Sequence, residues 1–248
     1  MLPILEIGPL VVPVPAILLL LGLWLGLSLA ERHAMRFGIS NQYLYNLVFI
    51  ALISGLVGAR LAYLLRYPQA FLSSPFSIIS PNPGLLDPWG FGLGALIGGL
   101  SYGQRKHLPF WQTLDALTPL LAVLAVTLGL SHLASGAAFG LPTELPWGIE
   151  LWGASRHPSQ IYETLAAIAI LVAVWPGRGL IRSAQPGIYF LSFVALSAGA
   201  HLFLEAFRGD SSVMAGGFRQ AQILAWVILA LALWALARKR AEPPAQTQ

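Results

Sequence analysis

The 248-residue sequence contains no cysteine. Disulfide bonds, thiolate metal ligands and a cysteine nucleophile are therefore excluded, and any thiol in a reaction has to come from the substrate. Charged residues are scarce too, at 10% of the chain against about 25% in an ordinary soluble domain. With 56% hydrophobic residues and a mean hydropathy of +0.71, this composition predicts an integral membrane protein.

The chain contains many long apolar runs. Seven runs approach or reach the length of about 20 residues that crosses a bilayer as a helix. They cover residues 13–30, 44–65, 89–103, 113–134, 160–175, 187–206 and 220–237. The third run is short for a hydrocarbon core of roughly 30 Å, so it crosses only if it begins earlier or the bilayer thins. We therefore predict an all-α, polytopic membrane protein with seven transmembrane helices in a single domain over residues 1–240, and a disordered tail at 241–248.

Basic residues alternate between the loops and predict the orientation of the chain. One set of loops holds Arg32, Arg36, Arg105, Lys106, Arg178, Arg182, Arg238, Lys239 and Arg240, and the other holds only Arg66, Arg156, Arg208 and Arg219. By the positive-inside rule, the amino terminus lies outside and the carboxyl terminus in the cytoplasm. The long loops at about 66–88 and 135–159 are then external. Because the basic residues follow the ends of the spans, their pattern argues against nucleic-acid binding.

Polar residues gather at the external ends of four spans, where a bilayer makes them costly. The ionisable or amide-bearing members, with one tyrosine, are Arg60, Tyr63, His132, His157, Gln160, Glu163, His201, Glu205 and Arg208. At 100° per residue, Ser197, His201, Glu205 and Arg208 fall on one stripe of a helix. Two arginines, two glutamates and three histidines at one depth predict a site for an anionic lipid headgroup.

Each of these residues also has a simpler structural explanation. Glu205 and Arg208 neutralise each other at positions i and i+3, Arg60 extends to the headgroups, and His132 bonds a nearby backbone group. Two features elsewhere are explained by structure alone. Gly94 and Gly98 predict close helix packing, and Asp115 predicts a favourable charge in the first turn of its own helix.

Four segments resemble those of one family of bacterial inner-membrane enzymes. RHPSQIYE at 156–163 closely resembles a motif of the prolipoprotein diacylglyceryl transferases, and GARLAYLL at 58–65 and LEAFRGD at 204–210 are similar to two others. IGPL near the start is similar to the amino-terminal segment of that family. Seven spans and an external amino terminus match its architecture too.

This resemblance implies an activity, partners and a membrane. The family transfers diacylglyceryl from phosphatidylglycerol to the lipobox cysteine of a preprolipoprotein, at the outer face of the bacterial inner membrane. The expected partners are phosphatidylglycerol or another anionic phospholipid and the signal segment of the preprolipoprotein, with no metal or cofactor. In this interpretation His132 is the general base or orients the thiol, and Arg208 and Arg60 hold the phosphate. Glu205 and His201 position them, while the segment from His157 to Glu163 shapes the site.

Several polar residues of the family are missing from this chain. Leu93 takes the place of a histidine, Gly129 that of an arginine, His132 that of an asparagine and Ala137 that of a glutamate, and the tyrosine expected in the first span falls near Pro15. Two further hypotheses therefore stay open. One is an inactive paralogue that still binds phospholipid or a lipoprotein signal segment. The other is a small-molecule transporter, ranked last because no repeat is evident and the polar groups lie away from the midplane.

Overall fold

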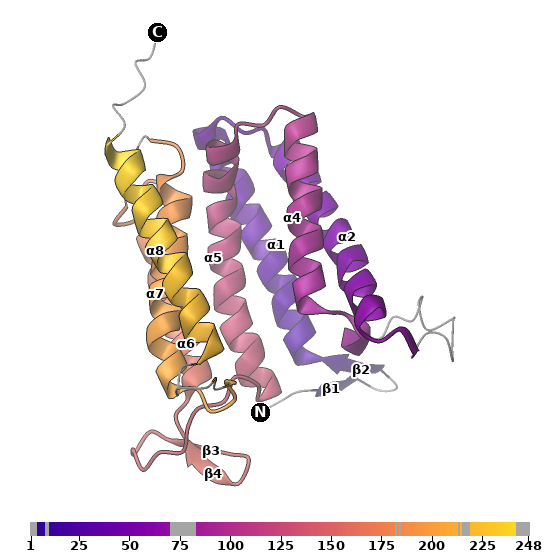
Figure 1. Ribbon diagram of the computed structural model, residues 1–248, viewed down its shortest axis with the longest axis vertical. Coiled ribbons are helices and arrows are strands. Elements are labelled where there is room, and N and C mark those ends of the chain that lie inside the picture. The colour runs from indigo at the N-terminus through magenta and orange to yellow at the C-terminus, as the bar shows by residue number, and fades with distance from the viewer. Residues whose placement is uncertain are drawn as a thin grey trace. The chain divides into compact units, whose positions relative to one another are not determined.

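The computed structural model describes residues 4–7, 10–69, 83–181, 183, 185–212, 214 and 219–241. These residues form mainly helices (Figure 1). The helices are α1 (Val14–Ala34), α2 (Asn41–Arg66), α4 (Pro88–Arg105), α5 (Phe110–Ser135), α6 (Ser159–Ala173), α7 (Ile188–Leu204) and α8 (Gln220–Ala241). Short 3-10 turns are η1 (Met35–Phe37), η3 (Pro83–Leu85) and η4 (Glu205–Phe207).

Five of these helices are long and apolar enough to cross a membrane. They are α1 continued through η1, α2, α5, α7 continued through η4, and α8, while α6 is apolar but shorter. The prediction of a mainly helical, multi-pass membrane protein is confirmed in this form. The count of seven spans and the orientation of the termini stay predictions.

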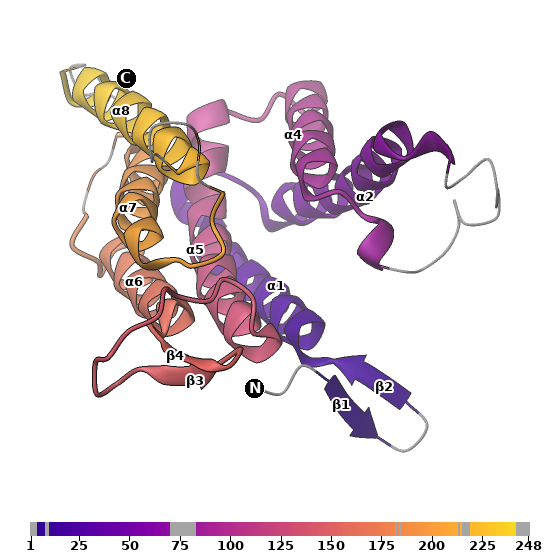
Figure 2. The ribbon, with the colours of Figure 1, turned by 60° about the horizontal axis from the view of Figure 1, so that its bottom comes forward.

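Two antiparallel hairpins interrupt the helical pattern, and the apolar runs did not predict them. Strands β1 (Ile4–Ile7) and β2 (Leu10–Pro13) pair with Ile4 opposite Pro13, and they lead directly into α1. Strands β3 (Ile149–Leu151) and β4 (Ala154–Arg156) pair with Ile149 opposite Arg156. The second hairpin lies just beyond the ends of α5 and α6 (Figure 2).

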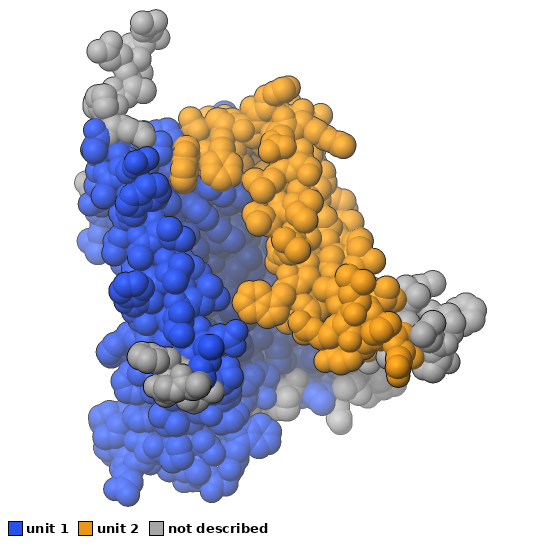
Figure 3. Space-filling view, in the orientation of Figure 1, with its two compact units in different colours: residues 1–37, 114–248 blue, residues 38–113 orange. Residues whose placement is uncertain are grey.

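The chain divides into two compact units (Figure 3). Unit 1 comprises residues 1–37 and 114–248, and unit 2 comprises residues 38–113. The single domain expected over residues 1–240 stays a prediction. Of the expected tail only residue 241 is described, and most of the expected loop at 66–88 lies outside the described residues as well.

Unit 2 is built on a close contact between α2 and α4. A Cβ atom added at Gly58 would lie 2.5 Å from the Gly90 carbonyl oxygen, and one added at Gly94 would collide with the Ser54 carbonyl. The absence of side chains therefore lets the two backbones touch, as expected for small residues at a membrane helix interface. Asp87 begins α4 by accepting a hydrogen bond from the Gly90 amide at 2.9 Å, and it pairs with Arg66 at 2.7 Å.

In unit 1 a buried carboxylate ties α5 to α7. Asp115 is 1% exposed and accepts hydrogen bonds from the amides of Gly187 at 2.5 Å and Phe190 at 2.9 Å. The N-cap of α7 is Gly187, which has no side chain to cap the helix itself. The expected role of Asp115 in the first turn of its own helix is wrong, because α5 begins at Phe110 and the carboxylate serves α7 instead.

A short extended segment joins the ends of three helices at the polar end of unit 1. The Leu141 amide donates to the Phe207 carbonyl at 2.8 Å, and the Gly209 amide donates to Phe139 at 2.8 Å. On its other side, the Leu141 carbonyl accepts from the His157 amide at 2.9 Å. The end of α7 and the start of α6 are thus bridged by the chain that leaves α5, and the polar side chains of all three meet there.

Candidate functional site

A histidine and a glutamate from neighbouring helices form the first part of the site. His132 lies in the last turn of α5 and Glu163 in the first turns of α6, and the Nδ1 atom of His132 is 2.9 Å from the Glu163 Oε2 atom. Both side chains are about a quarter exposed. A carboxylate only accepts hydrogen bonds, so in this pair Nδ1 is the donor, and in the corresponding neutral tautomer Nε2 is the acceptor. No other group among the described residues bonds to Nε2.

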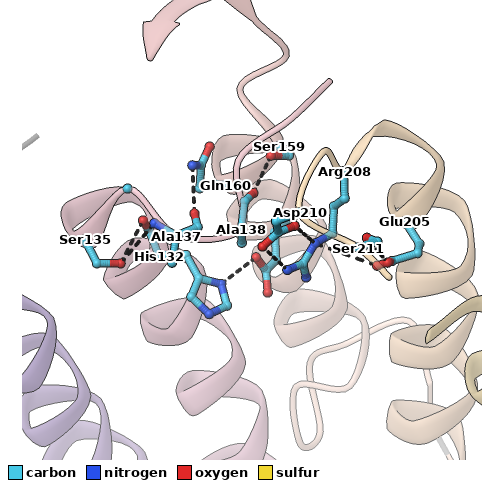
Figure 4. A network of polar contacts seen from close by, with 12 residues as sticks. His132, Ser135, Ala137, Ala138, Ser159, Gln160, Glu205, Arg208, Asp210 and Ser211 are labelled. Atoms are coloured by element: carbon cyan, nitrogen blue, oxygen red, sulfur yellow. Dashed lines mark hydrogen bonds and ion pairs between the residues drawn. The ribbon is translucent and has the colours of Figure 1, made fainter. Parts of the chain in front are cut away.

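A paired arginine forms the second part. Arg208 donates from Nε to Asp210 Oδ1 at 3.0 Å and from Nη2 to Asp210 Oδ2 at 2.9 Å, which makes a bidentate pair (Figure 4). The Glu205 Oε2 atom is further away, 3.8 Å from Arg208 Nε. His132 and Arg208 lie in the same network of polar contacts (Figure 4), and the charge of Glu163 raises the pKa of Arg208.

The pairing of Arg208 with Asp210 shifts the pKa of both groups. Burial alone would lower the pKa of Arg208 and raise that of Asp210. The hydrogen bonds and opposite charges of the pair overcome that burial, so the pKa of Arg208 is raised and the pKa of Asp210 is lowered. Both groups are therefore ionised at neutral pH, and the guanidinium is held in one orientation.

Glu205 is the buried centre of the third part. Its side chain is 2% exposed, its Oε1 atom accepts a hydrogen bond from Ser211, and its Oε2 atom lies 3.5 Å from His201 Nε2. Helix α7 ends at Leu204 and continues as the 3-10 turn η4, so Arg208 lies on extended backbone. The predicted single helical stripe is therefore wrong beyond Leu204, although His201, Glu205 and Arg208 still meet.

Two residues of the HPSQ segment support the chain that leaves α5. Gln160 is fully buried and donates from Nε2 to the Ala137 carbonyl at 2.9 Å, and Ser159 donates to the Ala138 carbonyl at 2.5 Å (Figure 4). His157 instead packs its ring against those of Phe207, at 5.3 Å between centroids, and Tyr162, at 6.3 Å. In this segment, Glu163 reaches the charged cluster directly, while His157 and Gln160 hold the surrounding structure.

The remaining two predicted site residues lie in unit 2. Arg60 donates from Nη1 to the Leu85 carbonyl at 3.1 Å, and the Tyr63 ring lies 4.9 Å from that of Tyr67. Unit 1 therefore brings together His132, Glu163, His201, Glu205 and Arg208, with His157 and Gln160 beside them. The participation of Arg60 and Tyr63 in the same site stays a prediction.

Three residues complete the cluster that sequence reasoning did not name individually: Asp210, Ser211 and Ser159, of which Asp210 and Ser159 lie in the segments 204–210 and 156–163 that it singled out. Asp210 stands two positions after Arg208, with Gly209 between them, and this Arg-Gly-Asp order was the available signal. The bidentate bond depends on the extended backbone at Arg208, which a helical interpretation of that segment concealed. Nothing in the sequence around Ser211 or Ser159 identifies their partners.

This arrangement is able to accept a proton and to hold an anion. The imidazole of His132, oriented by Glu163, presents a basic nitrogen, as a general base requires. The bonds to Asp210 use Nε and one hydrogen of Nη2, so the guanidinium still has Nη1 and the second hydrogen of Nη2 for an oxyanion. Base and cation thus lie in one cluster at the end of unit 1.

Comparison with known proteins gives one consistent result. A family model described as prolipoprotein diacylglyceryl transferase matches residues 3–238. The phosphatidylglycerol–prolipoprotein diacylglyceryl transferase of Synechococcus elongatus is 28% identical over 256 residues, covering 96% of this chain and 88% of the relative. Proteins of the same name from Clostridioides difficile and Geobacter sulfurreducens are 29% and 28% identical, covering 85% and 86% of this chain and 84% and 85% of the relatives.

Proposed function

The chain belongs to the prolipoprotein diacylglyceryl transferase family, and from that premise we propose that it transfers the diacylglyceryl group of phosphatidylglycerol to the lipobox cysteine of a lipoprotein precursor. The observation that carries the proposal is the His132–Glu163 pair beside the ionised Arg208. The chain has no cysteine of its own, so the thiol belongs to the acceptor and the enzyme cannot modify itself.

The proposed reaction begins with removal of the thiol proton. A free thiol has a pKa of about 8.5, so few thiols are ionised at neutral pH without a base. The Nε2 atom of His132 takes the proton, and Glu163 stabilises the imidazolium that forms. The sulfur then forms a bond to the glyceryl carbon, the bond from that carbon to the phosphate oxygen breaks, and glycerol phosphate leaves with the electron pair.

Arg208 acts on the phosphate in this proposal. Negative charge grows on the phosphate as the carbon–oxygen bond breaks, and a fixed guanidinium stabilises it without reorganising. Asp210 keeps the guanidinium oriented, and Glu205 with His201 lies behind it. Arg60 is proposed as a second phosphate ligand from unit 2, and Tyr63 as its neighbour on α2.

The proposed setting is the bacterial inner membrane, with seven spans and an external amino terminus. Seven helices in the described part of the chain, with alternating loop charge, support this topology, and α6, with 15 residues, is the shortest of them. The polar end of unit 1 then faces outward, where the signal segment of the precursor arrives. Other anionic phospholipids are proposed as competing ligands, because the guanidinium of Arg208 would bind the phosphate group that they all share.

A specific observation favours a second candidate, a phospholipid-binding paralogue without transfer activity. Gly129, which takes the place of an arginine of the family, is buried in α5, and a Cβ there would lie 2.5 Å from Thr164 Oγ1. An arginine side chain has no room at that contact between α5 and α6. Leu93, in the place of a histidine, is 60% exposed on α4. At both positions the chain lacks a polar group of the family, and the first candidate requires His132 to replace the missing groups.

The deciding experiment is a transfer assay with purified protein, phosphatidylglycerol and a lipobox peptide, read as the mass added to the peptide. We expect addition by the parent protein and a loss of at least about 100-fold in His132→Ala, the usual contribution of a general base. Activity of that variant should recover as the pH rises toward 9, because the thiol then ionises unaided.

The matched control is His33→Ala. His33 is another histidine in a helix of unit 1, and its Nδ1 atom bonds only the Leu29 carbonyl of its own helix. This control should keep full activity. Parent protein that binds phosphatidylglycerol but transfers nothing would establish the second candidate, and a fully active His132→Ala variant would exclude His132 as the base.

A further inference from the structure

Two buried side chains at the start of α6 bond a loop rather than the charged cluster. Ser159 is 4% exposed and Gln160 is 0% exposed, and they donate to the carbonyls of Ala138 and Ala137. We call residues 136–138 the support loop. The bond from Ser159 is buried and the bond from Gln160 is partly buried. Such bonds fix the position of a loop, because loss of the first would leave the buried Ala138 carbonyl unpaired.

The support loop has an unfavourable backbone that needs such fixing. Gly136 has a φ of 76° and Ala138 a φ of 52°. The left-handed region is open to glycine but costly for alanine, whose Cβ meets the following carbonyl. Ala138 is also 3% exposed, so water cannot stabilise alternative arrangements of its backbone. The conformation of Ala138 therefore depends on the bonds that its neighbours make.

The residue after Ala138 is bonded to the segment that carries Asp210. The Gly209 amide donates to the Phe139 carbonyl at 2.8 Å, and the next residue, Asp210, binds Arg208 through both of its oxygens. Ala138 also lowers the pKa of Asp210 through its backbone, as expected for an amide beside the carboxylate. A displacement of the support loop would therefore move the backbone that positions Asp210 and loosen the guanidinium that Asp210 orients.

We propose that Ser159 and Gln160 are positioning residues for Arg208, acting through the support loop and Asp210. The inference rests on the proposed function in taking the phosphate of phosphatidylglycerol as the ligand of Arg208. In this assignment Asp210 occupies Nε and Nη2 and directs Nη1 to the lipid, and no described residue bonds Nη1. Glu163 contributes a base partner from the same helix, so the start of α6 serves both halves of the site.

The test compares lipid binding by the parent and by Ser159→Ala, a substitution small enough to leave α6 intact. Binding is measured with purified protein and fluorescent phosphatidylglycerol or phosphatidylcholine in detergent micelles. We expect the dissociation constant for phosphatidylglycerol to rise about fivefold to tenfold, the usual effect of one hydrogen bond. The value for phosphatidylcholine should stay the same, and Ser159→Thr, which keeps the hydroxyl, should bind like the parent.

Two further measurements separate positioning from general weakening. We call the connection from Ser159 through the support loop and Asp210 to Arg208 the relay. In an Asp210→Asn background, Ser159→Ala should raise the dissociation constant little further, because the relay is already broken. Hydrogen exchange of the segment 205–212 should become faster in Ser159→Ala. Thr118→Val is the control, since it removes a buried hydroxyl of unit 1 that bonds only its own helix, and it should change neither measurement.

Each outcome decides one of the two proposals. The relay would be overturned if Ser159→Ala weakened phosphatidylglycerol binding equally in the parent and in the Asp210→Asn background. It would also be overturned if the parent preferred phosphatidylglycerol and Ser159→Ala bound that lipid as tightly as the parent. A parent with no preference for phosphatidylglycerol would contradict the proposed phosphate site instead. Hydrogen exchange does not require lipid, so it tests the relay even if the parent shows no preference for phosphatidylglycerol. Unchanged exchange at 205–212 in Ser159→Ala would then overturn the relay.

Discussion

The two units of the protein hold their helices together by different means. In unit 2, α2 and α4 touch through glycine and serine, and the charged pair of Arg66 and Asp87 lies at the ends of the helices. In unit 1, nearly inaccessible carboxylates lie among the helix ends. Asp115 accepts from two backbone amides, and Glu205 accepts from Ser211 through Oε1, while its Oε2 atom has no hydrogen-bond partner among the described residues. Unit 2 therefore depends on the shape of its contact, whereas unit 1 depends on buried polar groups, and the second kind of structure is the one that can carry chemistry.

The largest effect on stability is expected from adding side-chain volume between α2 and α4 in unit 2. Gly94→Leu should separate α2 from α4, because even a Cβ at Gly94 collides with the Ser54 carbonyl. We expect a loss of about 3 kcal/mol or more in the free energy of unfolding, at the upper end for overpacked sites. The measurement is unfolding of the purified protein in a series of detergent mixtures.

Gly92 provides the matched control for that substitution. A Cβ at Gly92 would meet nothing within 4 Å, although the residue lies in the same helix. Gly92→Ala should leave stability unchanged or raise it by up to about 1 kcal/mol, since alanine is the better helix former. If both variants unfolded alike, shape would not be what holds unit 2 together.

A smaller effect is expected from removing a polar group in unit 1. Asp115→Ala leaves the amides of Gly187 and Phe190 without their acceptor, at a cost of about 1–3 kcal/mol. Asp115→Asn keeps one oxygen acceptor and should lose less. Faster hydrogen exchange at the start of α7 should accompany the loss, and unchanged exchange there would show that the cap does not hold the helix.

The smallest effect concerns the pH dependence of unit 1. The pKa of Asp210 in the folded protein lies below its usual value of 3.8, so the unfolded chain binds its proton first as the pH falls. The Arg208–Asp210 pair therefore stabilises the fold above about pH 4, and this contribution is lost as the pH falls through the lowered pKa. Since the pair is partly exposed, the effect is modest.

The measurement is the melting temperature between pH 7 and pH 3. Asp210→Asn should melt below the parent at pH 7, and the difference should shrink toward pH 3. A constant difference across this range would mean that the pair contributes no charge-dependent stability.

The apolar architecture could be predicted from the sequence, because helix length and hydropathy are local properties. The run expected at 44–65 is α2 over Asn41–Arg66, and the glycine pair in α4 does mark close packing. The chemistry-bearing residues could also be named, since charges inside apolar runs are conspicuous. The sequence also predicted that the polar residues at the ends of the spans 113–134, 160–175 and 187–206 meet in one cluster.

The polar connections could not be predicted, because they join residues distant in the chain or depend on backbone shape. Asp115 accepts a hydrogen bond from Gly187, which lies 72 residues later in the chain, and no local sequence pattern predicts that partner. The bidentate pair of Arg208 and Asp210 requires the helix to end at Leu204, and three-residue strands such as β3 carry too little periodicity to detect. Unit 1 therefore departs most from sequence expectation where its buried polar groups are paired.

The cap that Asp115 places on α7 joins parts of the chain that are made at different times. The chain emerges from the ribosome amino terminus first, so Asp115 is made 72 residues before the amide of Gly187 exists. During that interval the carboxylate lacks the two backbone donors that it has in the folded protein. The contact that ties α5 to α7 therefore forms only after the start of α7 has been made.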